Sequence, residues 1–169
     1  FGNVMGSRGS VIPLFKKQIL EQRKVTVTDL KMTRYMMTPT QAVSLILEAN
    51  EQAKGGEVFV LKMPVVRLSD LVEIMLEEMQ KKYQLDQKIQ IEEIGLRPGE
   101  KMDEQLMTDD ERQKVIELDY MYIIPPIYGE KYTGYMSARI RDLNGINYVP
   151  DEIIDKEALI RWLKLEQLL

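Results

Sequence analysis

The stretch 1–15, FGNVMGSRGSVIPLF, places three glycines directly before a run of residues with helical character. Gly2, Gly6 and Gly9 form the pattern G-x-x-x-G-x-x-G, which is close to the loop that lays a dinucleotide pyrophosphate on a helix N-terminus. That loop needs a buried strand immediately before it within a βαβ unit, but only Phe1 precedes the first glycine. We interpret the stretch as a glycine-rich turn between a strand and a helix, and we favour a substrate-binding turn over a purely structural one.

The composition excludes several classes of protein and site. The 169 residues suit one domain or part of a larger one, and 44% hydrophobic residues can fill a core. The net charge is -4 and no cluster of Lys and Arg is interleaved with aromatic residues, so we expect no nucleic-acid partner. Because the chain contains no Cys and no His, thiolate and imidazole metal sites, Ser-His-Asp triads and cysteine nucleophiles are excluded, and we expect no metal.

The sequence also bears on location. No apolar run approaches the roughly 18 residues of a membrane span, and no signal peptide is recognisable. Together with the absence of Cys, this predicts a soluble, cytoplasmic protein without membrane insertion. Since natural chains start with Met unless they are processed, Phe1 predicts that the sequence is a fragment of a longer protein.

The order of the predicted elements indicates an α/β or α+β protein, because strands are mixed with helices and short loops. Thr38, Pro39 and Gln41 have the pattern of a capping box, and Ser69 is predicted to cap a further helix. The apolar side of the first of these helices is predicted to contain Ala42, Val43, Leu45, Ile46 and Ala49. Strands are predicted at 1–5, 25–28, 57–61, 88–94, 115–118 and 120–124, helices at 10–21, 38–55, 69–83 and 155–168, and a loop at 129–150.

Two further patterns concern buried side chains. Ile89, Ile91 and Ile94 follow an alternation that is typical of a half-buried strand. Glu92 and Glu93 are neighbours on this strand, so they should point to opposite faces and cannot act as a catalytic pair. Core filling, rather than a cofactor site, is the role predicted for Met32, Met36, Met37, Met75 and Met79.

Three stretches, taken in order along the chain, resemble one enzyme family. They are FGNVMGSRGSVIPLF at 1–15, VTVTD at 25–29 with MTRY at 32–35, and GLRPGEK at 95–101. Together they resemble the C-terminal half of the inverting UDP-N-acetylglucosamine 4,6-dehydratases, in the polysaccharide-biosynthesis branch of the extended short-chain dehydrogenases. The resemblance implies an α/β fold in which 1–126 holds the last strands and helices of the parallel sheet and a small α+β substrate-binding domain. Residues 127–169 would form a C-terminal loop and helix tail.

The resemblance also implies that the catalytic groups lie outside this chain. In the family, the dinucleotide-binding half and a catalytic Tyr-x-x-x-Lys pair precede the Gly-Asn-Val segment, and no tyrosine of this chain has Lys at that spacing. We therefore expect both upstream of Phe1, no catalytic residue here, and no activity of this chain alone. The full-length enzyme, a lyase, would use NADP bound mainly by the absent N-terminal half. It would oxidise C4 of the sugar, eliminate water across C5 and C6, and reduce C6 with inversion at C5.

A UDP-sugar partner follows from the resemblance, and its charged part requires suitable donors. Guanidinium groups and amides hold a diphosphate in one orientation, and the resemblance implies that Arg34 and Arg97 reach it. Glu100 would accept from a ribose hydroxyl, and Asn3 would lie near the diphosphate and sugar. The ordinary alternatives are a surface loop arginine for Arg97, a solvated or helix-starting acid for Glu100 and a turn-closing amide for Asn3.

The base of the nucleotide would lie between a helix start and a strand. The resemblance implies that Val11 packs on uracil, with Ser10 or nearby backbone groups hydrogen-bonded to it. Val25 and Val27 would form the other wall, although an ordinary buried strand face explains these two valines equally well.

Two other functions remain open at this point. A UDP-sugar 4-epimerase uses the same scaffold and the same contacts to UDP, and a non-catalytic nucleotide-sugar-binding or assembly module would explain the missing acid and base. For the full-length protein we expect a homo-oligomer.

Overall fold

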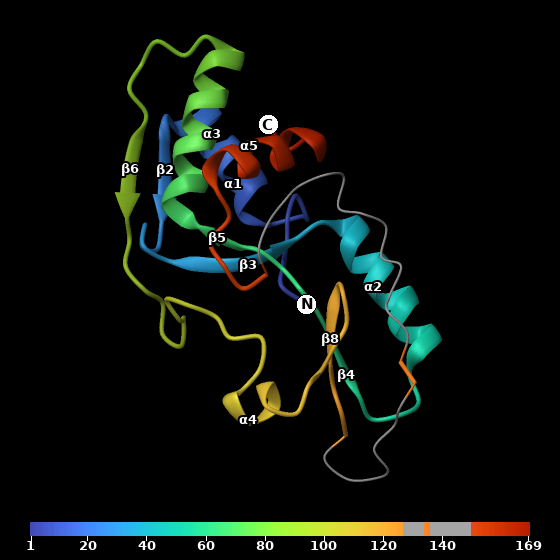
Figure 1. Cartoon of the computed structure of the whole chain (residues 1–169). Coiled ribbons are helices and arrows are strands. Elements are labelled where there is room, and N and C mark those ends of the chain that lie inside the picture. The colour runs from blue at the N-terminus through green and yellow to red at the C-terminus, as the bar shows by residue number, and fades with distance from the viewer. Residues whose placement is uncertain (127–133, 136–149) are drawn as a thin grey trace.

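The structure, a computed structural model, describes residues 1–126, 134–135 and 150–169, which form three small β-sheets with helices packed around them (Figure 1). The predicted loop at 129–150 lies largely outside the described residues. Strands and helices are mixed along the chain, so the α/β class expected from the sequence is confirmed. None of the helices in the described ranges is long and apolar enough to cross a membrane.

The central sheet joins the glycine-rich start of the chain to two strands that the sequence does not predict. Its order is β1 (Asn3–Val4), β3 (Thr33–Met37) and β5 (Val65–Arg67), with β1 parallel and β5 antiparallel to β3. β3 escapes prediction because it lacks an alternating pattern, and β5 because it has only 3 residues. Both strands depend on pairing with residues that are distant in the sequence; Met36 of β3, for example, pairs with Asn3 of β1.

The second sheet and three helices surround the larger apolar core. β2 (Lys24–Val27) pairs in parallel with β6 (Gln90–Glu93), and α1 (Val11–Gln22), α3 (Leu68–Tyr83) and α5 (Lys156–Leu165) lie beside them in the upper half of Figure 1. The buried side chains of this core include Phe15, Ile19, Val25, Leu71, Met75 and Leu159.

The third sheet is antiparallel and lies in the lower half of Figure 1. In it, β8 (Met121–Ile124) pairs with both β4 (Val58–Leu61) and β7 (Ile116–Glu117). α2 (Pro39–Gln52) and the short α4 (Asp109–Arg112) flank it. The smaller core here contains Met37, Leu45, Leu61, Met63, Met121 and Ile123. The prediction that methionines fill the core is confirmed, since Met32, Met36, Met37, Met75 and Met79 are all buried.

Two predicted helix caps have opposite outcomes. The capping box of α2 is confirmed, because the Thr38 hydroxyl accepts from the Gln41 N–H while the Gln41 side chain accepts from the Thr38 N–H. The prediction that Ser69 caps α3 is wrong, because the N-cap residue is Arg67 and it makes no side-chain cap. The N–H of Ser69 instead donates to the Leu30 carbonyl, so the neighbouring backbone satisfies this helix start.

Four apolar residues are more exposed than the sequence predicts. Val43 and Ile46 are 56% and 54% exposed, because α2 turns only a narrow side to the core. Ile91 and Ile94 are 42% and 52% exposed, because β6 lies on the outside of the molecule, where all four of its residues are exposed, and Ile94 follows it directly. Ile89, just before β6, is buried as predicted.

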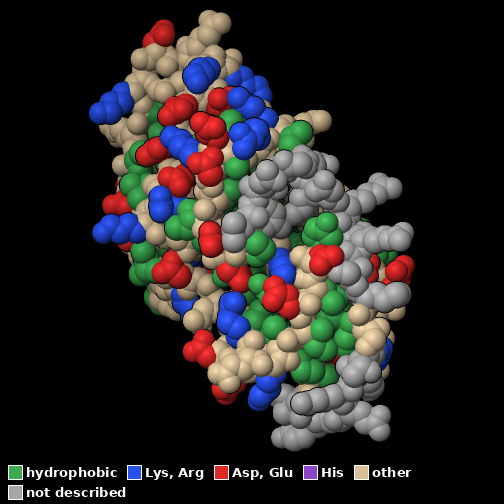
Figure 2. Space-filling view, in the orientation of Figure 1, with side chains coloured by type: hydrophobic (Ala, Val, Ile, Leu, Met, Phe, Trp, Pro, Cys, Tyr) green, Lys and Arg blue, Asp and Glu red, His purple; other side chains and the backbone are tan. Residues whose placement is uncertain are grey.

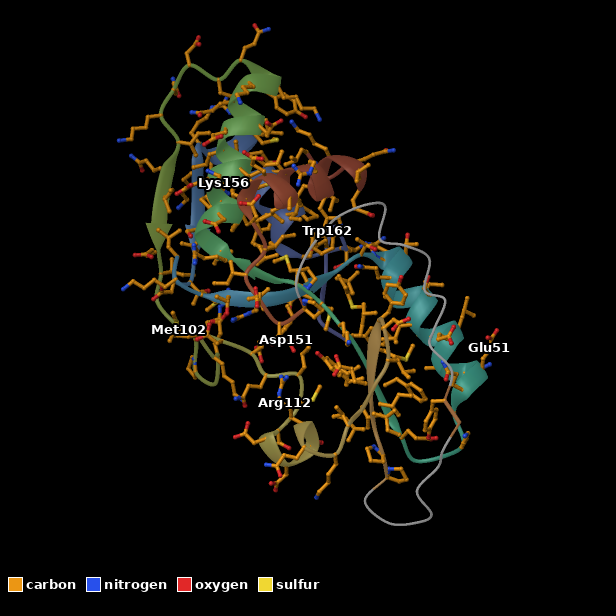
Figure 3. The ribbon with its side chains drawn as sticks, viewed as in Figure 1. Glu51, Met102, Arg112, Asp151, Lys156 and Trp162 are labelled. Carbon is orange, nitrogen blue, oxygen red and sulfur yellow. The ribbon has the colours of Figure 1, made fainter. Side chains whose placement is uncertain are left out.

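Helix α5 is held against α3 by charge pairs as well as by its apolar side. The Lys156 ammonium lies 2.8 Å from a carboxylate oxygen of Glu73 and 3.6 Å from one of Glu77. Figure 2 shows side chains of both charges mixed on this part of the surface. On the inner side of α5, Trp162 is 3% exposed (Figure 3). Both kinds of contact fix α5 to the larger core.

Residues beyond α5 reach the glycine-rich turn. Leu168 packs on Gly6, where an added Cβ would lie 2.6 Å from the Leu168 Cδ2. Gly6 also has a φ of 71°, which residues with side chains rarely adopt. The backbone therefore requires glycine at this position, and an added side chain would also displace Leu168.

Candidate functional site

A cavity of about 480 Å³ lies between the glycine-rich turn, the start of α1, β2 and the loop after β6. Two of the residues predicted to bind a ligand do not line it: Val25 is fully buried, and Arg34 contacts a lining residue instead. The fold thus brings predicted residues from three separate stretches of the chain to one concave surface. The predicted residues that line it are Asn3, Ser10, Val11, Val27, Arg97 and Glu100.

One side of the cavity, here called the helix wall, consists of Ser10, Val11, Leu14 and Phe15. Ser10 is the N-cap residue of α1, but its side chain makes no capping bond, and its buried Oγ has no hydrogen-bond partner in the described structure. The first N–H groups of a helix lack acceptors within it, and no acid stands in the first turn of α1. The helix wall therefore offers donors and a positive dipole end to a ligand oxygen.

The opposite side, here called the strand wall, consists of Thr26, Val27 and Thr28. Val27 is almost fully buried and belongs to the larger core, so this wall is anchored from behind. Gln18 of α1 fastens it to the helix: its Nε2 donates to the Thr26 hydroxyl at 2.6 Å, and its Oε1 accepts from the Thr26 N–H at 3.1 Å. The two walls are thus joined by hydrogen bonds as well as by apolar packing.

The charged rim of the cavity is organised around Glu100. Its carboxylate accepts from the Arg97 N–H at 3.1 Å and lies 3.6 Å from the Arg34 guanidinium. The same guanidinium donates to the carbonyls of Thr33 and Met102, at 2.7 and 3.0 Å. Arg34 therefore fastens the loop around Glu100 to β3, a structural role that its sequence motif does not reveal.

The glycine-rich turn does not have the surroundings of a dinucleotide loop. Gly6 and Gly9 have φ angles of 71° and 79°, as expected for a tight turn. The strands on either side of α1 belong to different sheets, however, since β1 pairs with β3 and β2 pairs with β6. The residues present therefore do not form the βαβ unit that would hold a dinucleotide pyrophosphate.

Sequence reasoning misses part of the lining. Leu14 and Ile94 add apolar surface and are 45% and 52% exposed, and Thr28 adds a hydroxyl. Leu14 follows Val11 by one helical turn, a spacing that could have found it. Ile94 carries no such signal, because the path of the chain after β6 decides where it lies.

A second polar cluster lies outside the cavity. The Asp151 carboxylate pairs with the Arg112 guanidinium at 3.3 Å (Figure 3). It also accepts from the Tyr122 hydroxyl at 3.3 Å. Burial, followed by the charge of Asp151, raises the pKa of Tyr122 to about 12. Within the described ranges, no group of His, Cys, Asp or Glu is large enough to hold a metal ion.

Known proteins provide an independent comparison. Residues 1–126 match the sequence profile of a family described as polysaccharide biosynthesis protein. The capsular polysaccharide biosynthesis protein CapD of Staphylococcus aureus is 50% identical over 123 residues, which are 71% of this chain and 20% of that protein. A UDP-glucose 4-epimerase of Rickettsia massiliae is 40% identical over 125 residues, which are 74% of this chain and 35% of that protein.

An inverting UDP-N-acetylglucosamine 4,6-dehydratase of Campylobacter jejuni is 35% identical over 127 residues, covering 75% of this chain and 35% of that protein. Among solved structures, Pen from Bacillus thuringiensis is 51% identical with a TM-score of 0.83, covering 100% of this chain and 49% of that one. The chain spans 20% to 35% of the length of these three curated relatives.

Proposed function

The chain belongs to the polysaccharide biosynthesis protein family, and from this premise we propose that it is the nucleotide-sugar-binding part of a UDP-sugar-modifying enzyme. The cavity carries this proposal, because it gathers helix donors, an arginine and a carboxylate around apolar side chains. A UDP-sugar has the complementary groups: a flat base, ribose hydroxyls, and a diphosphate with about two negative charges.

Each part of UDP has a matching part of the cavity. Uracil lies between Val11 on the helix wall and Val27 on the strand wall, with its oxygens toward Ser10 and the first N–H groups of α1. The ribose hydroxyls donate to Glu100, and the diphosphate lies near Arg97. The guanidinium of Arg34, which does not line the cavity, adds positive charge behind Glu100.

The finer proposal is a UDP-N-acetylglucosamine 4,6-dehydratase that makes a 4-keto-6-deoxy sugar for a surface polysaccharide such as capsule. The glycine-rich turn does not fit a dinucleotide, so we assign NADP and the catalytic acid and base to parts of the full-length protein outside this chain. The contribution of this chain is to bind UDP and to hold the sugar in a fixed orientation, which lowers the entropic cost of reaction.

The relatives named UDP-glucose 4-epimerase favour a second candidate, an epimerase that inverts C4 of the sugar. Both reactions need the same contacts with UDP, so the cavity is compatible with either reaction. The groups that separate the two reactions act on the sugar.

The test uses the longest natural reading frame that contains this chain, incubated with UDP-N-acetylglucosamine and NADP and followed by proton NMR. A new high-field methyl doublet, with loss of the C6 methylene signals, is expected for the dehydratase. A C4 epimer would replace the dehydratase with the second candidate. Unchanged substrate would contradict both reactions and leave a non-catalytic nucleotide-sugar-binding module.

A further inference from the structure

We infer that Gln18 is a positioning residue that sets the distance between the helix wall and the strand wall, and with it the affinity for the nucleotide. The inference rests on the proposed function. Gln18 lies on α1, one turn beyond Leu14 and Phe15, and does not itself line the cavity. It therefore acts through the two walls and not through contact with a ligand.

The contact is a pair of hydrogen bonds from one side chain to one residue. The amide of Gln18 both donates to the Thr26 hydroxyl and accepts from the Thr26 N–H. Two bonds of opposite direction fix the position and the orientation of β2 relative to α1. The apolar cluster that contains Phe15 and Val27 holds the same elements together, but hydrophobic contact has no direction and allows sliding.

Burial makes this contact difficult to replace. Gln18 is 9% exposed. In the described part of the chain, the other buried polar residues are Thr38 and Gln41. β2 has β6 on one edge, and the Thr26 N–H is directed at Gln18 on the other. With an apolar side chain at position 18 this part-buried N–H would lose its acceptor, so β2 is expected to move until the group finds another one.

The spacing of the walls matters because a flat base gains most from two close surfaces. Contacts between carbon atoms are strongest at about 3.5–4.0 Å, and a gap of about 0.5–1 Å loses a quarter to a half of the attraction. In the proposed function, Val11 and Val27 contact opposite faces of uracil. A small displacement of β2 therefore weakens binding even though every lining residue is still present.

The test compares Gln18→Met with the matched variant Gln41→Met in this chain. Both replace a buried amide with an unbranched apolar side chain, but Gln41 caps α2 and does not line the cavity. The measurements are the Kd for UDP by calorimetry and, without UDP, the hydrogen-exchange rate of the Thr26 amide by NMR. We expect Gln18→Met to raise the Kd about tenfold and to speed exchange at Thr26. Gln41→Met should leave both unchanged.

A third variant, Gln18→Glu, keeps an oxygen that can accept from both the N–H and the hydroxyl of Thr26. Its Kd should lie between those of the unaltered chain and Gln18→Met. An unchanged Kd in Gln18→Met, or in Gln18→Glu where Gln18→Met does not fold, overturns the inference. Equal weakening by Gln18→Met and Gln41→Met also overturns it. If the unaltered chain does not bind UDP, the proposed function fails, and the exchange rate at Thr26 alone decides whether Gln18 holds the walls.

Discussion

Two arginines near the cavity contribute differently to the fold. The Arg34 side chain is only 13% exposed, and its contacts with two carbonyls and with Glu100 hold the loop 95–101 against β3. The hydrogen bonds of Arg97, in contrast, involve its backbone, since its N–H donates to Glu100 and its carbonyl accepts from the Glu100 N–H. The two arginines therefore differ: the Arg34 side chain holds the loop, whereas the side chain of Arg97 lines the cavity and its backbone makes the contacts within the loop.

Arg97→Ala should weaken UDP binding by about tenfold or more, because a charge-assisted hydrogen bond contributes about 1.5–3 kcal/mol. The free energy of unfolding should stay the same, since the backbone contacts remain. Calorimetric titration with UDP and urea unfolding measure the two quantities. Arg161→Ala on α5, where the arginine is exposed, is the control and should bind UDP normally. Unaltered affinity in Arg97→Ala would remove Arg97 from the proposed site.

Tyr122 gives the stability of the chain a dependence on alkaline pH. Its pKa rises from 10.0 to about 12 through burial and the nearby Asp151 carboxylate, although Arg112 partly opposes this and Lys62 lies over the ring. A pKa that is raised in the folded state favours folding below pH 10 and loses this effect as the pH rises toward 12.

Urea unfolding at pH 9, 10 and 11 should therefore show a steeper loss of stability in the unaltered chain than in Tyr122→Phe. Tyr83→Phe, which changes an exposed tyrosine, should keep the slope of the unaltered chain. Parallel pH profiles for the unaltered chain and Tyr122→Phe would contradict the assignment.

The same capping motif starts two helices of very different length. α2 and α4 both start with a complete capping box, at Thr38 and Thr108, in which a side chain and the backbone bond each other reciprocally. Thr38 is buried and starts a helix of 14 residues, whereas Thr108 is exposed and starts one of 4 residues. The same motif therefore supports very different amounts of structure.

We expect Thr38→Ala to lower the free energy of unfolding by about 1–2 kcal/mol, because the buried N–H of Gln41 loses its acceptor. Thr108→Ala is the matched comparison, and water can replace its exposed hydroxyl, so its effect should be about 0.5 kcal/mol. Urea unfolding followed by circular dichroism measures both. Equal effects would show that burial of the cap has no influence.

Over the whole molecule, α5 completes the larger core. Ala158, Leu159, Trp162 and Leu163 are all buried against it, and Lys156 adds ion pairs to α3. These residues lie beyond the 1–126 stretch that matches the family profile. The larger core therefore includes residues on both sides of that limit.

Trp162→Ala should lower the free energy of unfolding by about 3–5 kcal/mol, as expected for the loss of a large buried aromatic side chain. Leu165→Ala removes a half-exposed leucine from the same helix and should cost less than about 1 kcal/mol. Since Trp162 is the only tryptophan, circular dichroism is the common measurement for both variants. A small effect of Trp162→Ala would mean that α5 contributes little to the core.

How much could be predicted from the sequence depends on how far apart the determining residues are. The capping box at Thr38 lies within 4 residues and was predictable, as was the turn before α1. β3 was not, because its conformation depends on partners at Asn3 and Val66. Likewise Ser69 resembles a cap, but the Leu30 carbonyl takes over that task from a distant part of the chain.

The candidate site follows the same rule. Ser10, Arg97 and Glu100, which the motifs single out, line one cavity. The hydrogen bonds of Arg34 to Met102 and of Gln18 to Thr26 could not be predicted, because each joins a helix or strand to another segment whose position only the fold sets.

The packing of Leu168 on Gly6 has a consequence for evolution. The φ of 71° restricts position 6 to glycine, whereas the Leu168 side chain that packs on it can shift or change. Among natural sequences, position 6 is therefore expected to stay glycine while the residue that covers it varies.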